Sequence, residues 1–188
     1  MIYNLPYLIP MAAILLWLGR SGSAIPYIVE IDRQGGARAV GPATEAYKPS
    51  DAQIAFHLAR FVENVRSLSI DAVVVRQNWL KAYDFVTDRA AVTLNEYARE
   101  NDPFAKVGRE TVAIEVTSVV RASEASFQIR WLEKSFEGGA PKATNRLTGI
   151  FSIVVTPPRT VDLVRRNPLG IYVHAFNWSQ DLNPGDGK

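Results

Sequence analysis

Hydrophobic residues recur at helical spacing from position 50 onward. Apolar side chains stand three or four positions apart over residues 54–68, which places them on one face of an α-helix. Ser50 precedes this stripe and Asp51 follows Ser50 directly, a combination typical of the start of a helix. Asp71 is predicted to begin a second helix and Asp88 a third. The side chains predicted to face inward are Ile54, Leu58, Phe61, Val62, Val65 and Leu68 in the first helix, Val74, Val75, Trp79, Ala82 and Val86 in the second, and Ala91, Leu94 and Tyr97 in the third.

The spacing of apolar residues changes to two after residue 110, which predicts strands. Residues 137–139 (E-G-G) form a turn between the second and third of these strands, and Pro157-Pro158 ends the third. A helical turn at residues 160–166 and a last strand at 169–178 follow. Helices followed by antiparallel strands predict an α+β fold, a curved four-stranded antiparallel sheet covered by three helices. The predicted core-facing strand residues are Val112, Ile114, Val116, Val120, Phe127, Ile129, Trp131, Leu147, Phe151, Ile153 and Val155.

The first 24 residues differ from the rest of the chain. Residues 2–19 carry no charged side chain, and a membrane-spanning helix needs about 20 apolar residues. A transmembrane anchor at 1–24 is therefore predicted, followed by an α+β domain at 25–182 and a flexible tail at 183–188. A cleaved signal peptide ending at Ala24 and a buried core helix are the alternatives. The residues expected to contact lipid are Leu8, Ile14, Leu15, Leu16 and Trp17.

Residues 25–32 (I-P-Y-I-V-E-I-D) predict a strand just after the anchor. Q-G-G at 34–36 reads as a turn, and residues 37–40 return as a second short strand.

Composition and motifs exclude several kinds of chemistry. The 188 residues contain no cysteine, so disulfides and thiolate sites are excluded, and the net charge of +2 argues against a dedicated nucleic-acid site. His57 and His174 lack further ligands at metal-binding spacing, and neither a P-loop nor a G-x-S-x-G sequence is present. We therefore expect no catalytic residue, metal site or cofactor. Tyr83 and Asp84 are the nearest candidates for an acid or base if the curved sheet enclosed a pocket.

Residues 167–170 (N-P-L-G) stand just before the last apolar run. Proline and glycine at these positions predict a β-turn that sets the register of the following strand, and an exposed turn is also a possible docking point. In the last strand, alternation places Tyr172, Phe176 and Trp178, together with His174, on one face. Both faces of that strand are apolar or aromatic. The aromatic face therefore packs either within the chain or against another protein.

Three segments together resemble a known family. They are V-E-I-D with the following glycine pair, W-L-K-A-Y-D in the second predicted helix, and N-P-L-G-I-Y-V at the last strand. In this order, over about residues 10–180, the chain resembles the TrbF branch of the bitopic inner-membrane assembly proteins of type IV secretion and conjugation systems.

The resemblance implies a short cytoplasmic tail, one transmembrane helix and a periplasmic domain with a nuclear-transport-factor-2-like fold in the bacterial inner membrane. It implies a non-enzymatic scaffold that self-associates and contacts core-complex and pilus subunits. Asn167, Pro168 and Gly170 match the motif linked to assembly, and this start lacks most of the cytoplasmic tail. The alternatives are a small curved-sheet enzyme, a secreted periplasmic binding module, and a cytoplasmic domain with an N-terminal interaction helix.

Overall fold

The computed structural model describes residues 27–31, 37–42 and 48–181. The chain divides into two compact units, one of residues 1–47 with 157–168 and the other of residues 48–156 with 169–188. The predicted anchor at 1–24 and the predicted tail at 183–188 lie outside the described residues. Among the described helices, none has the length and apolar character needed to cross a membrane.

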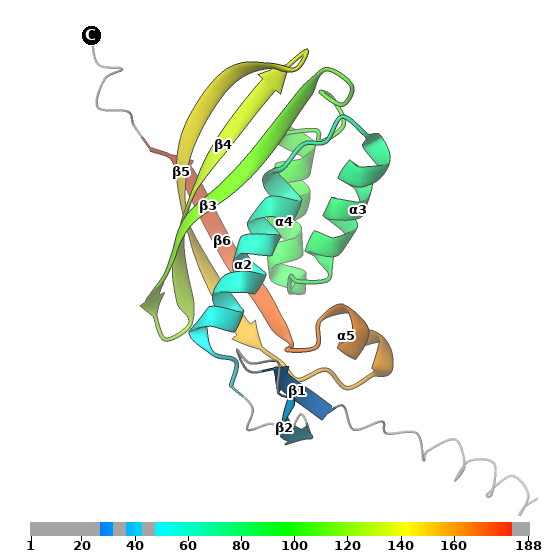
Figure 1. Ribbon diagram of the computed structural model, residues 1–188, viewed down its shortest axis with the longest axis vertical. Helices are drawn as coiled ribbons and strands as arrows, with labels where there is room; N and C mark the ends of the chain where they lie inside the picture. Colours follow the sequence, from blue (N-terminus) through cyan, green and yellow to red (C-terminus); the bar gives the residue numbers. More distant parts are fainter. Residues whose placement is uncertain (1–26, 32–36, 43–47, 182–188) are drawn as a thin grey trace, which may run out of the picture. The chain divides into compact units, whose positions relative to one another are not determined.

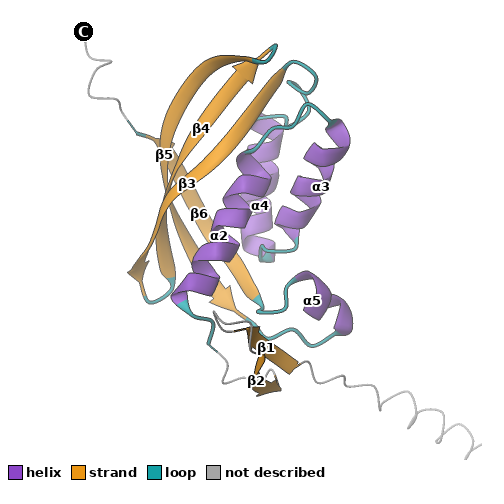
Figure 2. Cartoon of the chain, in the orientation of Figure 1, coloured by secondary structure: helices purple, strands orange, loops and turns teal. Residues whose placement is uncertain are grey.

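The larger unit holds helices on one side of a curved sheet (Figure 2). The sheet has four antiparallel strands in the order β3-β4-β5-β6. Helices α2 and α4 lie against it, and α3 packs on α2. This arrangement confirms the predicted α+β fold with an antiparallel sheet. The elements are α2 (Asp51–Arg66), α3 (Ala72–Tyr83), α4 (Asp88–Glu100), β3 (Glu110–Ser123), β4 (Ser126–Glu137), β5 (Ala140–Val155) and β6 (Ile171–Gln180).

The helices begin at polar caps, as the sequence predicts for two of the three. Ser50 and Gln53 form a reciprocal capping box at α2, and the Asp71 carboxylate accepts from the N–H of Val73 at 2.7 Å at α3. The prediction for α4 is wrong by one residue: Thr87 is the cap, and Asp88 occupies the first turn. There its negative charge favours the partial positive charge of the helix N-terminus.

Aromatic rings dominate the core between α2 and the sheet. Phe61 of α2 is fully buried, and its ring lies edge-on to Phe151 at 6.1 Å between centroids. A side chain on Gly149 would place its Cβ 2.8 Å from the Phe151 ring and 3.2 Å from Trp131, so only glycine lets these rings approach β5 so closely. The predicted core residues that are buried include Ile54, Leu58, Phe61, Val62, Val65, Val75, Trp79, Ala82, Leu94, Phe127, Ile129, Trp131, Leu147, Phe151 and Ile153.

A bulge in β3 overturns one predicted core position. The pairing with β4 shifts between Val116 and Ser118, which adds one residue to β3. Because strand faces alternate, the shift turns Val119 toward the core and leaves Val120 56% exposed. The prediction that Val120 faces the core with Val116 is therefore wrong.

Helix ends and narrow packing stripes explain the other misplaced residues. Val74 is exposed because α3 buries only a narrow stripe, Val75, Trp79 and Ala82. Val86 lies beyond α3 and forms an isolated bridge to β6. In α4 the buried position is Ala90 rather than Ala91, and Val155 is exposed at the last position of β5.

The smaller unit contains a hairpin and a short helix. β1 (Tyr27–Ile31) and β2 (Ala37–Pro42) pair antiparallel, as predicted from the apolar segment and its glycine turn. Helix α5 (Val161–Arg166) forms the predicted helical turn, and the Thr160 hydroxyl caps it by accepting from the N–H of Leu163 at 3.3 Å.

Candidate interaction site

The N-P-L-G segment, residues 167–170, joins α5 to β6 (Figure 1). Asn167 ends α5: its N–H donates at 2.8 Å to a carbonyl of the last helical turn, and the residue is fully buried. Pro168 is exposed. Gly170 has a φ of +60°, a conformation that side chains other than hydrogen disfavour. Its carbonyl accepts from the N–H of Thr156 at 2.8 Å, so the pairing of β5 with β6 continues to the turn, as the predicted register-setting role requires.

β6 carries a bulge that the sequence pattern does not reveal. Val173 pairs with Ile153, whereas Ala175 pairs with Ser152, the preceding residue of β5. His174 is therefore an extra residue in β6. A bulge of this kind moves every later side chain of the strand to the opposite face.

The bulge places Phe176 and Trp178 on the core face together with Ile171 and Val173. Ile171 and Val173 are buried, and both aromatic rings pack against the same core. Tyr172 precedes the bulge and alternates with its buried neighbours, so it lies on the opposite face. The prediction that Tyr172 shares a face with Phe176 and Trp178 is wrong.

The two rings belong to an aromatic stack within the chain. The centroids of Phe176 and Trp178 lie 4.7 Å apart with nearly parallel planes. Trp178 meets Tyr97 of α4 edge-on at 5.2 Å, and Phe176 meets Phe61 of α2 at 5.7 Å. Such pairs add to the stabilisation from burial, by about 0.5–1.5 kcal/mol each.

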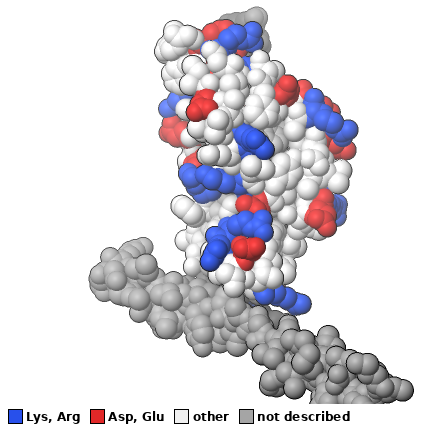
Figure 3. Space-filling view, turned by 90° about the vertical axis from the view of Figure 1, so that its right-hand side faces the viewer, with Lys and Arg blue, Asp and Glu red and all other residues white. Residues whose placement is uncertain are grey.

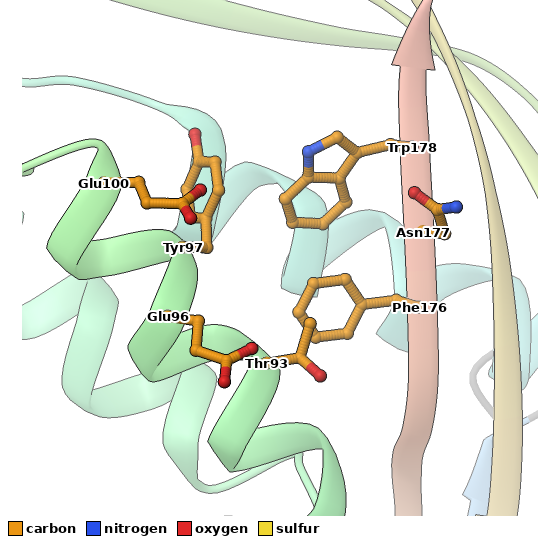
Figure 4. A pocket seen from close by; sticks show the side chains of 7 residues that line it. All are labelled: Thr93, Glu96, Tyr97, Glu100, Phe176, Asn177 and Trp178. Atoms are coloured by element: carbon orange, nitrogen blue, oxygen red, sulfur yellow. The ribbon is translucent and has the colours of Figure 1, made fainter.

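A groove runs between α4 and β6, beside this stack (Figure 4). Its volume is about 210 Å³. On the strand side the rings of Phe176 and Trp178 point toward α4, while Asn177 points away (Figure 4). The α4 residues Thr93, Glu96, Tyr97 and Glu100 line the other side.

The groove contains two carboxylates that no described cation pairs with. Glu96 and Glu100 are exposed and stand one helical turn apart. The ion pairs among the described residues involve neither of them. Like charges four residues apart on a helix destabilise it slightly, although both of these side chains are exposed to water.

A larger cleft, of about 500 Å³, shares Tyr97 and Glu100 with this groove, and its charged lining residues are of both signs. Arg66 donates to both oxygens of Glu133 at 2.6 and 2.9 Å and also to the Tyr97 hydroxyl. Burial opposes the charge of Arg66, but the Glu133 carboxylate outweighs it, so the pKa of the guanidinium is raised. The Trp131 indole N–H donates to Glu133 at 2.9 Å, which further occupies that carboxylate. Arg66 and Glu133 thus form a structural pair.

Three of the candidates for acid–base or metal chemistry contact uncharged neighbours. The Tyr83 hydroxyl donates to Asn95 at 2.5 Å, and burial raises its pKa. Asp84 is the C-cap residue of α3. His57 contacts the Phe85 ring at 5.4 Å, while His174 lies 3.2 Å from the Thr87 hydroxyl. No group of three metal-ligating side chains occurs within the part of the chain that the structure describes.

Charges are mixed on the surface that carries α3. In Figure 3 basic and acidic side chains alternate over this face, with no extended area of one sign. Such a surface produces no strong single-sign field for steering a polyanion.

The chain is similar to proteins of one family throughout most of its length. A family model described as VirB8 protein matches residues 6–181. The chain belongs to the VirB8 family. A curated relative, the conjugal transfer protein TrbF of Rhizobium radiobacter, is 37% identical over 161 residues, which are 84% of this chain and 73% of the relative. The resemblance inferred from the three sequence segments is confirmed.

Solved structures support the same fold for this VirB8-family chain. The TrwG component of a type IV secretion system from Bartonella birtlesii superposes with a TM-score of 0.62 at 15% identity, covering 74% of this chain and 98% of that one. The VirB8 protein of Agrobacterium tumefaciens gives a TM-score of 0.61 at 13% identity, covering 74% of this chain and 100% of its own. At these identities the likeness concerns the fold alone.

Sequence reasoning missed the acidic side of the groove in this VirB8-family chain. Glu96 and Glu100 were readable as a polar stripe on the third helix with Thr93. Nothing in the pattern showed that β6 lies opposite them. That placement depends on a pairing between residues far apart in sequence.

Proposed function

We propose that this chain is a non-enzymatic scaffold subunit of a type IV secretion apparatus that transfers DNA between bacteria. A single transmembrane helix within residues 1–24 holds it in the inner membrane, and the α+β domain lies in the periplasm. There it self-associates and contacts core-complex and pilus subunits. The observation that carries this proposal is the 37% identity to a conjugal transfer protein over 84% of the chain.

Two further observations support the role of a subunit rather than of a catalyst. The family match begins at residue 6, so the apolar N-terminal segment belongs to the region that the family shares. The part-buried carboxylate of Glu133 accepts hydrogen bonds from Arg66 and Trp131, and it is therefore poorly placed to act as an acid or base. The proposed role therefore depends on the binding surfaces of the domain and on its membrane anchor, and not on a reacting group.

The N-P-L-G turn is the proposed assembly motif. Asn167 and Gly170 shape its backbone from buried positions, and Pro168 presents the exposed side. Tyr172, on the outer face of β6, supplies a further aromatic contact to the partner. In this arrangement Asn167 and Gly170 are positioning residues, and Pro168 and Tyr172 meet the partner.

The test compares DNA transfer by Gly170→Ala and Gly108→Ala chains. Gly108 also has a positive φ, +83°, so both changes impose backbone strain of about 1–2 kcal/mol. A Cβ at Gly108 would meet no atom within 4 Å, so the control carries this strain without a steric clash. We expect Gly170→Ala to reduce mating frequency at least tenfold while Gly108→Ala leaves it near the parental level. Both chains should remain in the membrane fraction in equal amounts.

A surface substitution separates contact from stability. Pro168→Ala changes an exposed side chain and should lower transfer without changing the midpoint of thermal unfolding, whereas the exposed Pro141→Ala should alter neither. Parental transfer by both Gly170→Ala and Pro168→Ala would remove the case for this turn as an assembly motif.

A further inference from the structure

β6 is the last strand of the sheet, and the described residues pair with only the start of its outer edge. The N–H of Val173 donates to the carbonyl of Phe85 at 2.8 Å, and the N–H of Thr87 donates to the carbonyl of Val173 at 3.0 Å. Residues 85–87 thus run parallel to β6 for one bridge before α4 begins. The pairing along this edge stops there in the described chain.

The register beyond the bulge shows which backbone groups the edge presents. The N–H of Asp181 donates to the carbonyl of Arg146 on β5 at 2.8 Å. Antiparallel pairs alternate between bonded and non-bonded residues, so Ser179 and Asn177 also face β5. Phe176 and Trp178 consequently turn their N–H and carbonyl groups away from β5. An open edge of this kind is a template for another strand.

The side chains beside this edge are acidic and aromatic. In Figure 4 α4 rises next to β6, with Glu96 at the level of Phe176 and Glu100 at that of Trp178. Residues four apart on a helix are about 6 Å apart along its axis. Residues two apart on a strand are about 6.6–6.8 Å apart. Alternate side chains of an added strand therefore match the spacing of Glu96 and Glu100.

We propose that the groove between α4 and the β6 edge binds an extended, basic segment of another subunit, which pairs with β6 as an additional strand. Lysine or arginine at alternate positions would meet Glu96 and Glu100, and the intervening side chains would lie toward solvent. Main-chain hydrogen bonds supply the affinity and the two carboxylates the selectivity. This inference rests on the proposed function, because it names the chemistry of one partner of the scaffold.

A second copy of this chain fits the groove less well than a basic segment does. A two-fold symmetric pairing of β6 with itself would bring the Glu96 and Glu100 pairs of both copies to one junction. Like charges placed opposite each other across an interface are unfavourable. The charge of the groove therefore favours a different chain of opposite sign.

The experiment measures peptide binding to the full chain in a neutral detergent at low salt. The probe is a short peptide of alternating lysine and threonine, compared with its glutamate–threonine counterpart and with a version N-methylated at alternate residues. We expect the lysine peptide to shift the amide signals of Phe176 and Trp178. N-methylation on the pairing side should weaken binding at least tenfold, because it removes the donors that pair with β6.

Charge substitutions in the protein give the second readout. Glu96→Gln combined with Glu100→Gln should weaken lysine-peptide binding about tenfold at low salt and less at high salt. Glu124→Gln, an exposed carboxylate on the β3–β4 turn, is the matched control and should leave binding unchanged. These changes keep the shape of exposed side chains, so the fold is retained.

Several results would overturn the inference. They are no binding of the lysine peptide, equal binding of the glutamate or the N-methylated peptide, and no effect of the double substitution. Signals of Phe176 and Trp178 that shift with protein concentration in the absence of peptide would instead assign the groove to a second copy. Each of these outcomes leaves the mating test of Gly170 unaffected, so failure of the groove and failure of the proposed function are distinguishable.

Discussion

Two ion pairs of this chain differ in how much they contribute to stability. Arg66 and Glu133 satisfy each other inside a cleft, with side chains only 15% and 12% exposed. Asp51 and Arg121 pair at the surface, where water screens the charges and such pairs contribute little to stability. The part-buried pair is the more costly one to break, because removing either partner leaves an uncompensated charge with little access to water. Burial also disfavours the charged form of His57, the histidine on α2.

His57 is the residue expected to make stability depend on pH near neutrality. Burial against Phe85 and other neighbours lowers its pKa below the usual 6.5, so the unfolded chain binds this proton more readily than the folded one. Its stabilising effect is therefore complete above about pH 6.5 and is lost as the pH falls through the lower, folded-state pKa. Replacing it by a neutral glutamine should flatten the pH profile in this range.

Chemical unfolding of the parental and His57→Gln chains at several pH values from about 7.5 to 5 checks this. The difference in unfolding free energy between the two should change in favour of the variant as the pH falls. A constant difference over that range would show that His57 titrates alike in the folded and unfolded states. Carboxylates such as Asp51 titrate at lower pH and affect both chains equally.

At the scale of elements, bulges decide which residues form the core. β3 contains an extra residue after Val116 and a second one after Arg121, and β6 contains one, His174. Each bulge reverses the faces of the positions that follow it. In β6 the consequence is large. Phe176 and Trp178 join the aromatic stack and form one wall of the groove only because His174 is inserted before them.

Deletion of His174 should therefore prevent a stable fold. Removing one residue would turn Phe176 and Trp178 outward, and loss of one large aromatic side chain from a core costs about 3–5 kcal/mol. Domains are stable by only about 5–15 kcal/mol in total. We expect the cooperative thermal transition, followed by circular dichroism, to be lost.

The matched control is His174→Ala, which keeps the extra residue and removes only the ring. It should unfold cooperatively, with a modest decrease in midpoint from the lost contact to the Thr87 hydroxyl. A deletion variant as stable as His174→Ala would mean that β6 reaches the same core positions in another register.

For the whole molecule, the proposed role depends on tethering as much as on surface. An anchored domain moves in two dimensions near its partners, so weak contacts act at a high effective concentration. The groove at β6 and the N-P-L-G turn are small surfaces, which on their own suit weak binding. Anchoring at residues 1–24 would let several such contacts act together.

An anchor exchange tests this dependence. A chain in which an unrelated single-span segment replaces residues 1–24 should retain mating at near the parental frequency, whereas residues 25–188 exported without any anchor should lose it by at least tenfold. Fractionation and immunoblotting confirm the location and amount of each. Parental transfer by the unanchored domain would show that attachment is dispensable, and loss with the exchanged anchor would assign a specific contact to residues 1–24.

The sequence by itself determined the local elements of this protein. The stripe that begins at Ser50, the cap at Asp71, the period-two strands and the turn at 167–170 all depend on neighbours within a few positions, and the family followed from short segments in a fixed order. These features are local because capping, periodicity and turn conformation act over one or two turns of chain.

Only the tertiary structure decided the faces of the strands beyond their bulges, the ion pair of Arg66 with Glu133, and the groove between α4 and β6. A bulge is a mismatch between two paired strands, so it has no signature in the alternation of either strand alone. The ion pair and the groove join residues that are remote in sequence. Such contacts depend on how whole elements pack, which a pattern along the chain does not record.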